Sequence, residues 1–164
     1  KGDAMNLERF VSTQDRIWPL PLTEIRNREK RHHWAWFTLP QVKGLGRSEF
    51  AKSFAIDDLD HARAYLAHPV LGPRLIETCA AMVALEDISA EKVLGPIDAL
   101  KLQSCATLFA EAGGPEIFDH VLARFFGGLR CETTLDYLAG RRALPTDDEY
   151  FINPNAAKSA DSAL

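Results

Sequence analysis

The sequence predicts a single compact all-α domain of about seven to eight short helices. Three stretches carry this prediction. Apolar side chains fall in one arc of a helix over residues 69–86 and again over 116–126, at about 100° per residue. Residues 98–112 are apolar over most of the helix circumference, which is typical of a buried helix. We therefore expect 69–86 and 98–112 to form the centre of the domain.

Capping residues and helix breakers delimit the remaining helices. Asn6, Ser48, Asp58 and Ser89 are residue types that cap helix N-termini, and glycine and proline end several of the apolar patterns. The further helices are expected at 6–11, 23–28, 49–55, 59–66, 89–95 and from Thr133 or Thr134 to 140. The domain would then span 6–140. Residues 1–5 would be a vector-derived remnant or a disordered start, and 141–164 an extended tail.

The stretch from Lys30 to Ser48 is the most unusual part of the chain. It contains two of the three tryptophans, two of the five histidines and the Gly44–Leu–Gly46 turn. Its aromatic richness is typical of a strand, but the helical remainder offers such a strand no partner for its backbone. We therefore expect a short helix or an irregular buried segment that ends at Pro40.

Charge is distributed unevenly along the chain. The formal net charge is −4, yet residues 26–47 carry six Lys or Arg against Glu29 alone. A basic region on an acidic protein favours an anionic small ligand or an acidic partner. It argues against nucleic acid as a partner, because nucleic-acid-binding domains are usually basic overall.

The composition excludes several other classes. No apolar run approaches the roughly 20 residues of a membrane helix, and the sequence shows no apolar signal peptide. The three cysteines are odd in number and lie in predicted helices or at their edges, so we expect reduced buried thiols and a cytoplasmic location. No Cys-x-x-Cys spacing is present, so we expect no metal site. No motif calls for a cofactor, and none specifies a reaction.

Our first functional hypothesis is a pocket for a small anion such as a nucleotide or phosphorylated metabolite. Trp34 and Trp36 would stack on the ligand, and His33 is the best candidate for a general acid–base. Charge would come from Lys30, Arg47 and Lys101, hydrogen bonds from Gln41, Ser48 and Ser104, and close backbone approach from Gly44 and Gly46. Whether a reaction follows binding is left open.

Each part of this pocket also has a simpler interpretation. The tryptophans can be core anchors, the glycine turn can be an ordinary turn before a capped helix, and Lys101 can extend along its helix to water. The competing hypothesis is a non-catalytic interaction module that docks an acidic partner on the basic 26–47 region. The sequence leaves the oligomeric state open.

Several short motifs, in this order, resemble one known family. They are Lys30-Arg-x-His-Trp-x-Trp-Phe, Gly44-Leu-Gly-x-Ser, Ala62-Arg-Ala-Tyr-Leu-x-His-Pro-Val-Leu-Gly72 and Asp98-x-Leu-Lys-x-x-Ser104. The chain is similar in these stretches to the bacterial family known as domain of unknown function 1810. Members are often labelled calpastatin, a disordered and repetitive inhibitor, which does not fit this compact and unrepeated composition. The resemblance implies a mainly helical fold and no particular activity.

Overall fold

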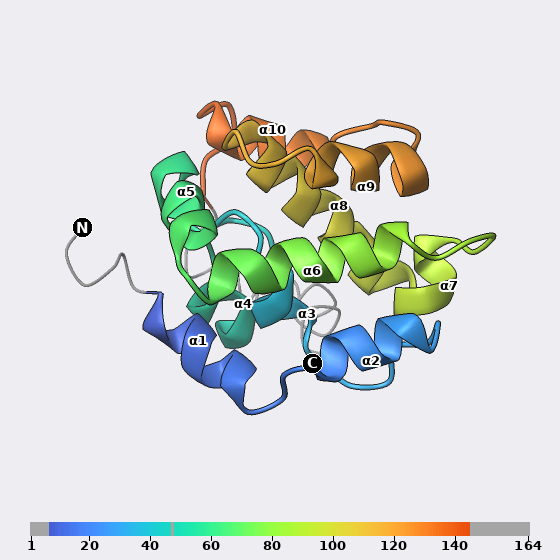
Figure 1. Ribbon diagram of the computed structural model, residues 1–164. Coiled ribbons are helices and arrows are strands. Elements are labelled where there is room, and N and C mark those ends of the chain that lie inside the picture. The colour runs from blue at the N-terminus through green and yellow to red at the C-terminus, as the bar shows by residue number, and fades with distance from the viewer. Residues whose placement is uncertain (1–6, 47, 145–164) are drawn as a thin grey trace.

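The computed structural model describes residues 7–46 and 48–144, and these form ten helices around one core (Figure 1). The helices are α1 (Glu8–Asp15), α2 (Leu20–Arg26), α3 (Ala35–Thr38), α4 (Glu49–Ser53), α5 (Leu59–Ala67), α6 (Leu71–Val83), α7 (Ala90–Leu94), α8 (Pro96–Glu111), α9 (Ile117–Phe126) and α10 (Glu132–Leu138). The described residues contain no strand, only an isolated parallel bridge between Val42 and Ile56. The predicted all-α class is confirmed.

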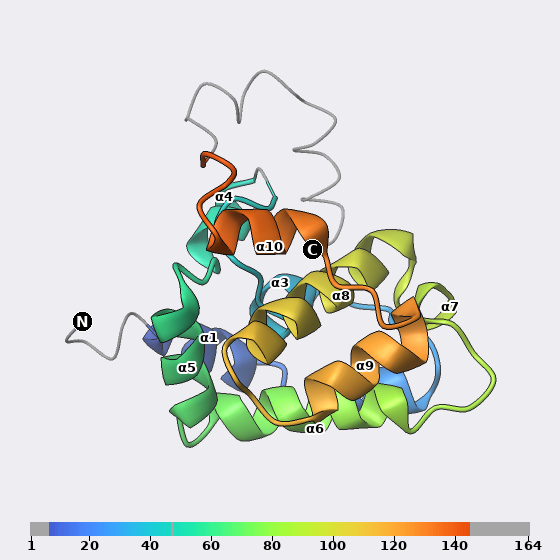
Figure 2. The ribbon, with the colours of Figure 1, turned by 90° about the horizontal axis from the view of Figure 1, so that it is seen from above.

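Helix α8 is the centre of the molecule. Ten of its sixteen residues are buried, and it packs against α3, α5, α7, α9 and α10 (Figure 2). The long helix α6 lies along one side and packs against α2, α5 and α9. The two central helices are therefore those that the apolar periodicity predicted.

Several helices begin at other residues than predicted, because a proline or a capping residue type can lie either before a helix or inside its first turns. Helix α6 begins at Leu71 rather than at 69, because Val70 is its N-cap, and α8 begins earlier than predicted, at Pro96 in the first turn. Helix α2 begins at Leu20, so Thr23 lies inside it. The described residues form ten helices rather than seven to eight, because one-turn pieces such as α3 are separate.

The predicted caps have mixed outcomes. The side chains of Ser48, Asp58 and Ser89 accept backbone N–H groups at the starts of α4, α5 and α7, as expected. The predicted threonine cap of the last helix is wrong: Cys131 is the N-cap of α10, and Thr134 is buried inside it. The predicted cap Asn6, the start at 1–5 and the tail from 145 lie outside the described residues.

All three cysteines are free thiols, as predicted. Cys79 and Cys105 are buried, and Cys131 is half-buried. Burial raises the pKa of the Cys79 thiol to about 12, so this side chain stays protonated and unreactive near neutral pH. None of the helices in the described ranges is long and apolar enough to cross a bilayer.

Candidate functional site

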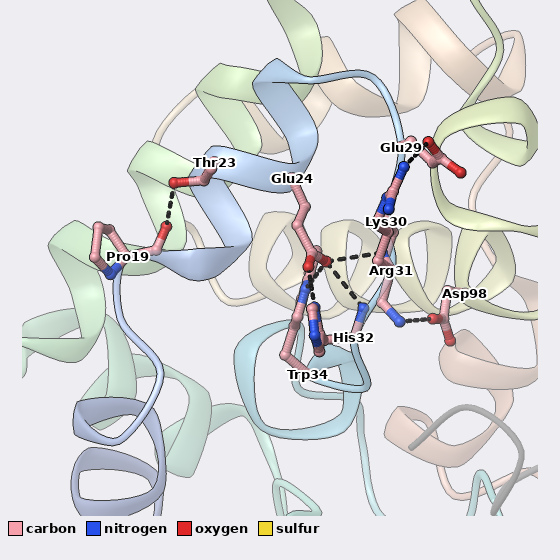
Figure 3. Close-up of polar contacts among 9 residues, drawn as sticks. All are labelled: Pro19, Thr23, Glu24, Glu29, Lys30, Arg31, His32, Trp34 and Asp98. Atoms are coloured by element: carbon pink, nitrogen blue, oxygen red, sulfur yellow. Dashed lines mark hydrogen bonds and ion pairs between the residues drawn. The ribbon is translucent and has the colours of Figure 1, made fainter.

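The segment 30–34 is held in place by the carboxylate of Glu24 on α2 (Figure 3). One of its oxygens accepts the backbone N–H groups of Arg31 and His32 at 2.9 and 3.1 Å, and the indole N–H of Trp34 at 2.9 Å. The other oxygen contacts Nδ1 of His32. This buried carboxylate therefore fixes the loop from which Lys30 and His33 project.

Hydrogen bonding sets the charge of Glu24. Burial alone would raise the pKa of this carboxyl group, but donors from His32, Trp34 and two backbone amides lower it to about 2. Glu24 is thus ionised across the physiological range. Sequence reasoning missed it, because its partners lie seven to ten residues further along the chain and no helical spacing links them.

Two buried lysines share one buried carboxylate beside this loop. Lys30 Nζ lies 2.7 Å from one oxygen of Asp98, and Lys101 Nζ lies 2.9 Å from the other. All three side chains are only 5–6% exposed. We call Lys30, Asp98 and Lys101 the charge triad; it joins the 30–48 stretch to α8. Figure 3 shows the pair between Lys30 and Asp98.

The Lys101 ammonium does not reach water. It lies 4.2 Å from the centroid of the Trp36 ring and 2.9 Å from the Asp98 carboxylate, its partner among the described residues. Burial lowers the pKa of Lys101, while the Asp98 carboxylate raises it. Lys101 therefore does not extend along its helix to solvent. It forms the buried end of the triad.

A cavity of about 240 Å³ opens next to the triad. Its lining is Lys30, Arg31, His33, Leu94, Gly95, Pro96, Ile97 and Asp98. One wall is the cationic loop, and the other is the start of α8, where the helix dipole places partial positive charge. His33 is an exposed residue. Burial of part of its ring lowers its pKa, and the positive charge of the nearby Lys30 lowers it further.

The two tryptophans do not line this cavity. Trp34 is 1% exposed and belongs to the main core, and Trp36 is 4% exposed and packs on Ala51. Both fit the core-anchor interpretation, so we do not retain the stacking role for them. Trp36 still contributes to the site, because its ring contacts Lys101.

The glycine turn is shaped by packing. A Cβ on Gly44 would lie 2.6 Å from the Tyr137 ring, and one on Gly46 would lie 2.3 Å from the Trp36 ring. Both glycines have positive φ, and the side chain of Ser48 caps α4. Gly44, Gly46 and Ser48 thus have structural roles here. Arg47, expected to supply charge, lies outside the described residues.

The remaining predicted site residues lie away from the cavity. Ser104 is buried, and its hydroxyl contacts Sγ of Cys131 at 3.3 Å. Gln41 is buried too, and its backbone oxygen accepts the N–H of Ile56. Of the eleven predicted residues, the structure brings Lys30 and His33 to the cavity and places Lys101 and Trp36 directly behind it. The sequence hypothesis gave no site role to Glu24, nor to Asp98, although a family motif begins at Asp98.

Replacing Gly46 with Ala is expected to lower the free energy of unfolding by about 2–3 kcal/mol. The new methyl group would overlap Trp36, and φ of +71° is strained for alanine. Gly127→Ala is a matched control, because φ is +61° there and a Cβ would meet nothing within 4 Å. Its cost should be only about 1 kcal/mol of backbone strain. Urea unfolding measures both, and equal losses would contradict the Trp36 contact.

Among the described residues, no group of three or more His, Cys, Asp or Glu side chains could hold a metal ion.

The family model described as "Protein of unknown function (DUF1810)" matches residues 4–138, which confirms the resemblance in the motifs. A similar solved structure is that of the conserved hypothetical protein Rv1873 from Mycobacterium tuberculosis, with 40% identity and a TM-score of 0.80. The match covers 82% of this chain and 97% of that one. No curated protein matches the chain.

Proposed function

Since the chain belongs to the DUF1810 family, whose function is unknown, we propose a function from the site alone: the domain binds a small anionic molecule. Its phosphate or carboxylate group would occupy the cavity between Arg31, His33 and the start of α8. Nucleotides and phosphorylated metabolites are the ligand class. The three free cysteines support the cytoplasmic location that we propose with it.

The charge triad carries this proposal. Two ammonium groups and one carboxylate leave an excess positive charge in a place that water barely reaches. Burying an uncompensated charge is costly, and a bound anion would reduce that cost. Lys30 lines the cavity and is held toward it by Asp98, so its ammonium is positioned before a ligand arrives.

The size of the cavity limits what it can enclose. Sites for drug-sized ligands are typically about 300–1,000 Å³, and this one is about 240 Å³. The anionic group would therefore lie inside, with the rest of the molecule extending outward. His33 stands at this opening, and its lowered pKa favours the neutral ring, which can accept a proton from a bound ligand.

Replacing Lys30 with Met is expected to weaken anion binding at least about tenfold and to leave the fold intact. Methionine fills the buried volume, and the remaining Lys101–Asp98 pair is balanced in charge. The change in unfolding free energy should stay within about 1 kcal/mol. Calorimetric titration with inorganic phosphate, a nucleoside monophosphate, a sugar phosphate and citrate measures the loss. Lys101→Met should have a smaller effect in the same direction.

Lys43→Met is the control, because Lys43 is an exposed lysine of the same basic 26–47 region outside the cavity lining. It should bind the anions as the unchanged chain does. If no anion of the panel binds, the proposal fails, and a module that docks an acidic partner on the basic region becomes the better hypothesis. Equal losses for Lys30→Met and Lys43→Met would also count against the cavity.

A further inference from the structure

We propose that the natural ligand is an amphipathic anion, whose charged end lies in the cavity and whose short apolar group lies on α8. This inference rests on the proposed function and narrows its ligand class. The chemistry is that of a phosphate or carboxylate attached to a small alkyl or aryl group. The structure supports it through the composition of the cavity wall and through two exposed side chains.

The two walls of the cavity differ in character. The loop side presents Lys30, Arg31 and His33. The side of α7 and α8 presents the apolar Leu94, Pro96 and Ile97, together with the Asp98 carboxylate that pairs with Lys30. A site for a free inorganic anion has no need of an apolar wall, because such an anion gains nothing from apolar contact. A ligand with both a charged and an apolar end would use both walls.

The apolar wall continues outside the cavity along α8. Ile97 is 39% exposed and Leu100 is 62% exposed, although most of this helix is buried. The two side chains are three residues apart and therefore neighbours on the helix surface. A single exposed leucine is ordinary in a folded protein. These two differ because one of them lines the cationic cavity and the other extends its wall.

The dimensions favour a short apolar group. Three residues of helix span about 4.5 Å along the axis, which is the length of about four bonded carbon atoms. A long acyl chain would pass beyond Leu100. We therefore expect the ligand to contact α8 with three to five carbon atoms. An apolar surface of this size is too small to bind a lipid bilayer.

A series of alkyl phosphates tests this inference. Inorganic phosphate, methyl, butyl and octyl phosphate are titrated into the full chain by calorimetry. A methylene that is covered on one side should gain about half of the free energy of full burial, which improves the affinity about twofold. Butyl phosphate should thus bind about tenfold more tightly than methyl phosphate, and octyl phosphate should add little more. The same chain lengths as carboxylates extend the test to the other anion.

Leu100→Ser should flatten the series between methyl and butyl phosphate and leave the affinity for inorganic phosphate unchanged. Leu144→Ser, which removes another exposed leucine outside the cavity lining, is the control and should keep the gain. A flat series in the unchanged chain that still binds phosphate overturns this inference but not the proposed function. If no anion of the earlier panel and no member of the alkyl phosphate and carboxylate series binds, both fail. A gain that persists in Leu100→Ser overturns the placement of the apolar group on α8.

Discussion

Replacing Asp98 with Ala is expected to lower the free energy of unfolding by about 3–5 kcal/mol, the largest effect of any single change proposed for this chain. Removal of one partner from a buried ion pair leaves an uncompensated buried charge, and costs in this range are typical. Here two ammonium groups would lose their shared partner. The melting temperature should fall by at least about 6 °C for a domain of this size.

Asp60→Ala is the matched control for this prediction. Asp60 also lies in the first turn of its helix and pairs with a basic residue three positions on, Arg63, at 3.0 Å. That pair is exposed at 78% and 53%, so its loss should cost less than about 1 kcal/mol. Burial is the main difference between the two pairs. Similar losses for both variants would mean that the triad is no more costly to break than a surface pair.

A double substitution separates charge from packing in the Asp98 result. If the loss comes from uncompensated ammonium groups, Asp98→Ala combined with Lys101→Met should be more stable than Asp98→Ala alone by about 1–2 kcal/mol. Added phosphate should also raise the melting temperature of Asp98→Ala more than that of the unchanged chain, because the anion would replace the lost carboxylate. A double variant no more stable than Asp98→Ala would point to lost packing instead.

Sequence periodicity was sufficient for the fold class because the helices are local structures. The apolar arcs of α6 and α9 follow from residues three and four apart, and so do the caps at Ser48, Asp58 and Ser89. The starts of α2 and α10 were misplaced, since Thr23 and Thr134 are capping residue types that here lie inside helices. Local propensity cannot distinguish these two uses of a threonine.

Only part of the candidate site could be predicted, because sequence patterns report on local structure and most contacts in the site are not local. Lys101 stood out because a lysine at the border of an apolar helix face needs an explanation, and its contact with Trp36 supplies one. The sequence could not show that Asp98 pairs with Lys30. The two residues lie far apart along the sequence, and only tertiary packing brings their charged atoms to 2.7 Å. For Trp34 and Trp36 the sequence left two interpretations open, because aromatic richness alone does not distinguish a ligand platform from a core.

Glu24 provides the second large expected effect, and it is one that depends on pH. Its carboxyl group has a pKa of about 2 in the folded chain against an ordinary value of 4.5. Below both values the group is protonated in the folded and unfolded chains and contributes nothing. Above 4.5 it is ionised in both and contributes fully, about 3 kcal/mol for a shift of this size. Stability should therefore be lost as the pH falls from about 4.5 toward 2.

Glu24→Gln tests this account, because glutamine keeps the shape of the side chain and removes the charge. At pH 7 the variant should be less stable than the unchanged chain by about 3 kcal/mol, and this gap should close as the pH falls from 4.5 toward 2. Glu29→Gln changes an exposed carboxylate that pairs with Arg31 at 3.3 Å, and it should differ from the unchanged chain by less than about 0.5 kcal/mol at every pH. Urea unfolding at pH 7, 4.5 and 3 measures all three chains.

A gap that stays constant with pH would show that the loop depends on the shape of this side chain and not on its charge. A gap that closes would show that the ionised carboxylate stabilises the loop that carries Lys30 and His33, and protonation of Glu24 in acid should then also weaken anion binding.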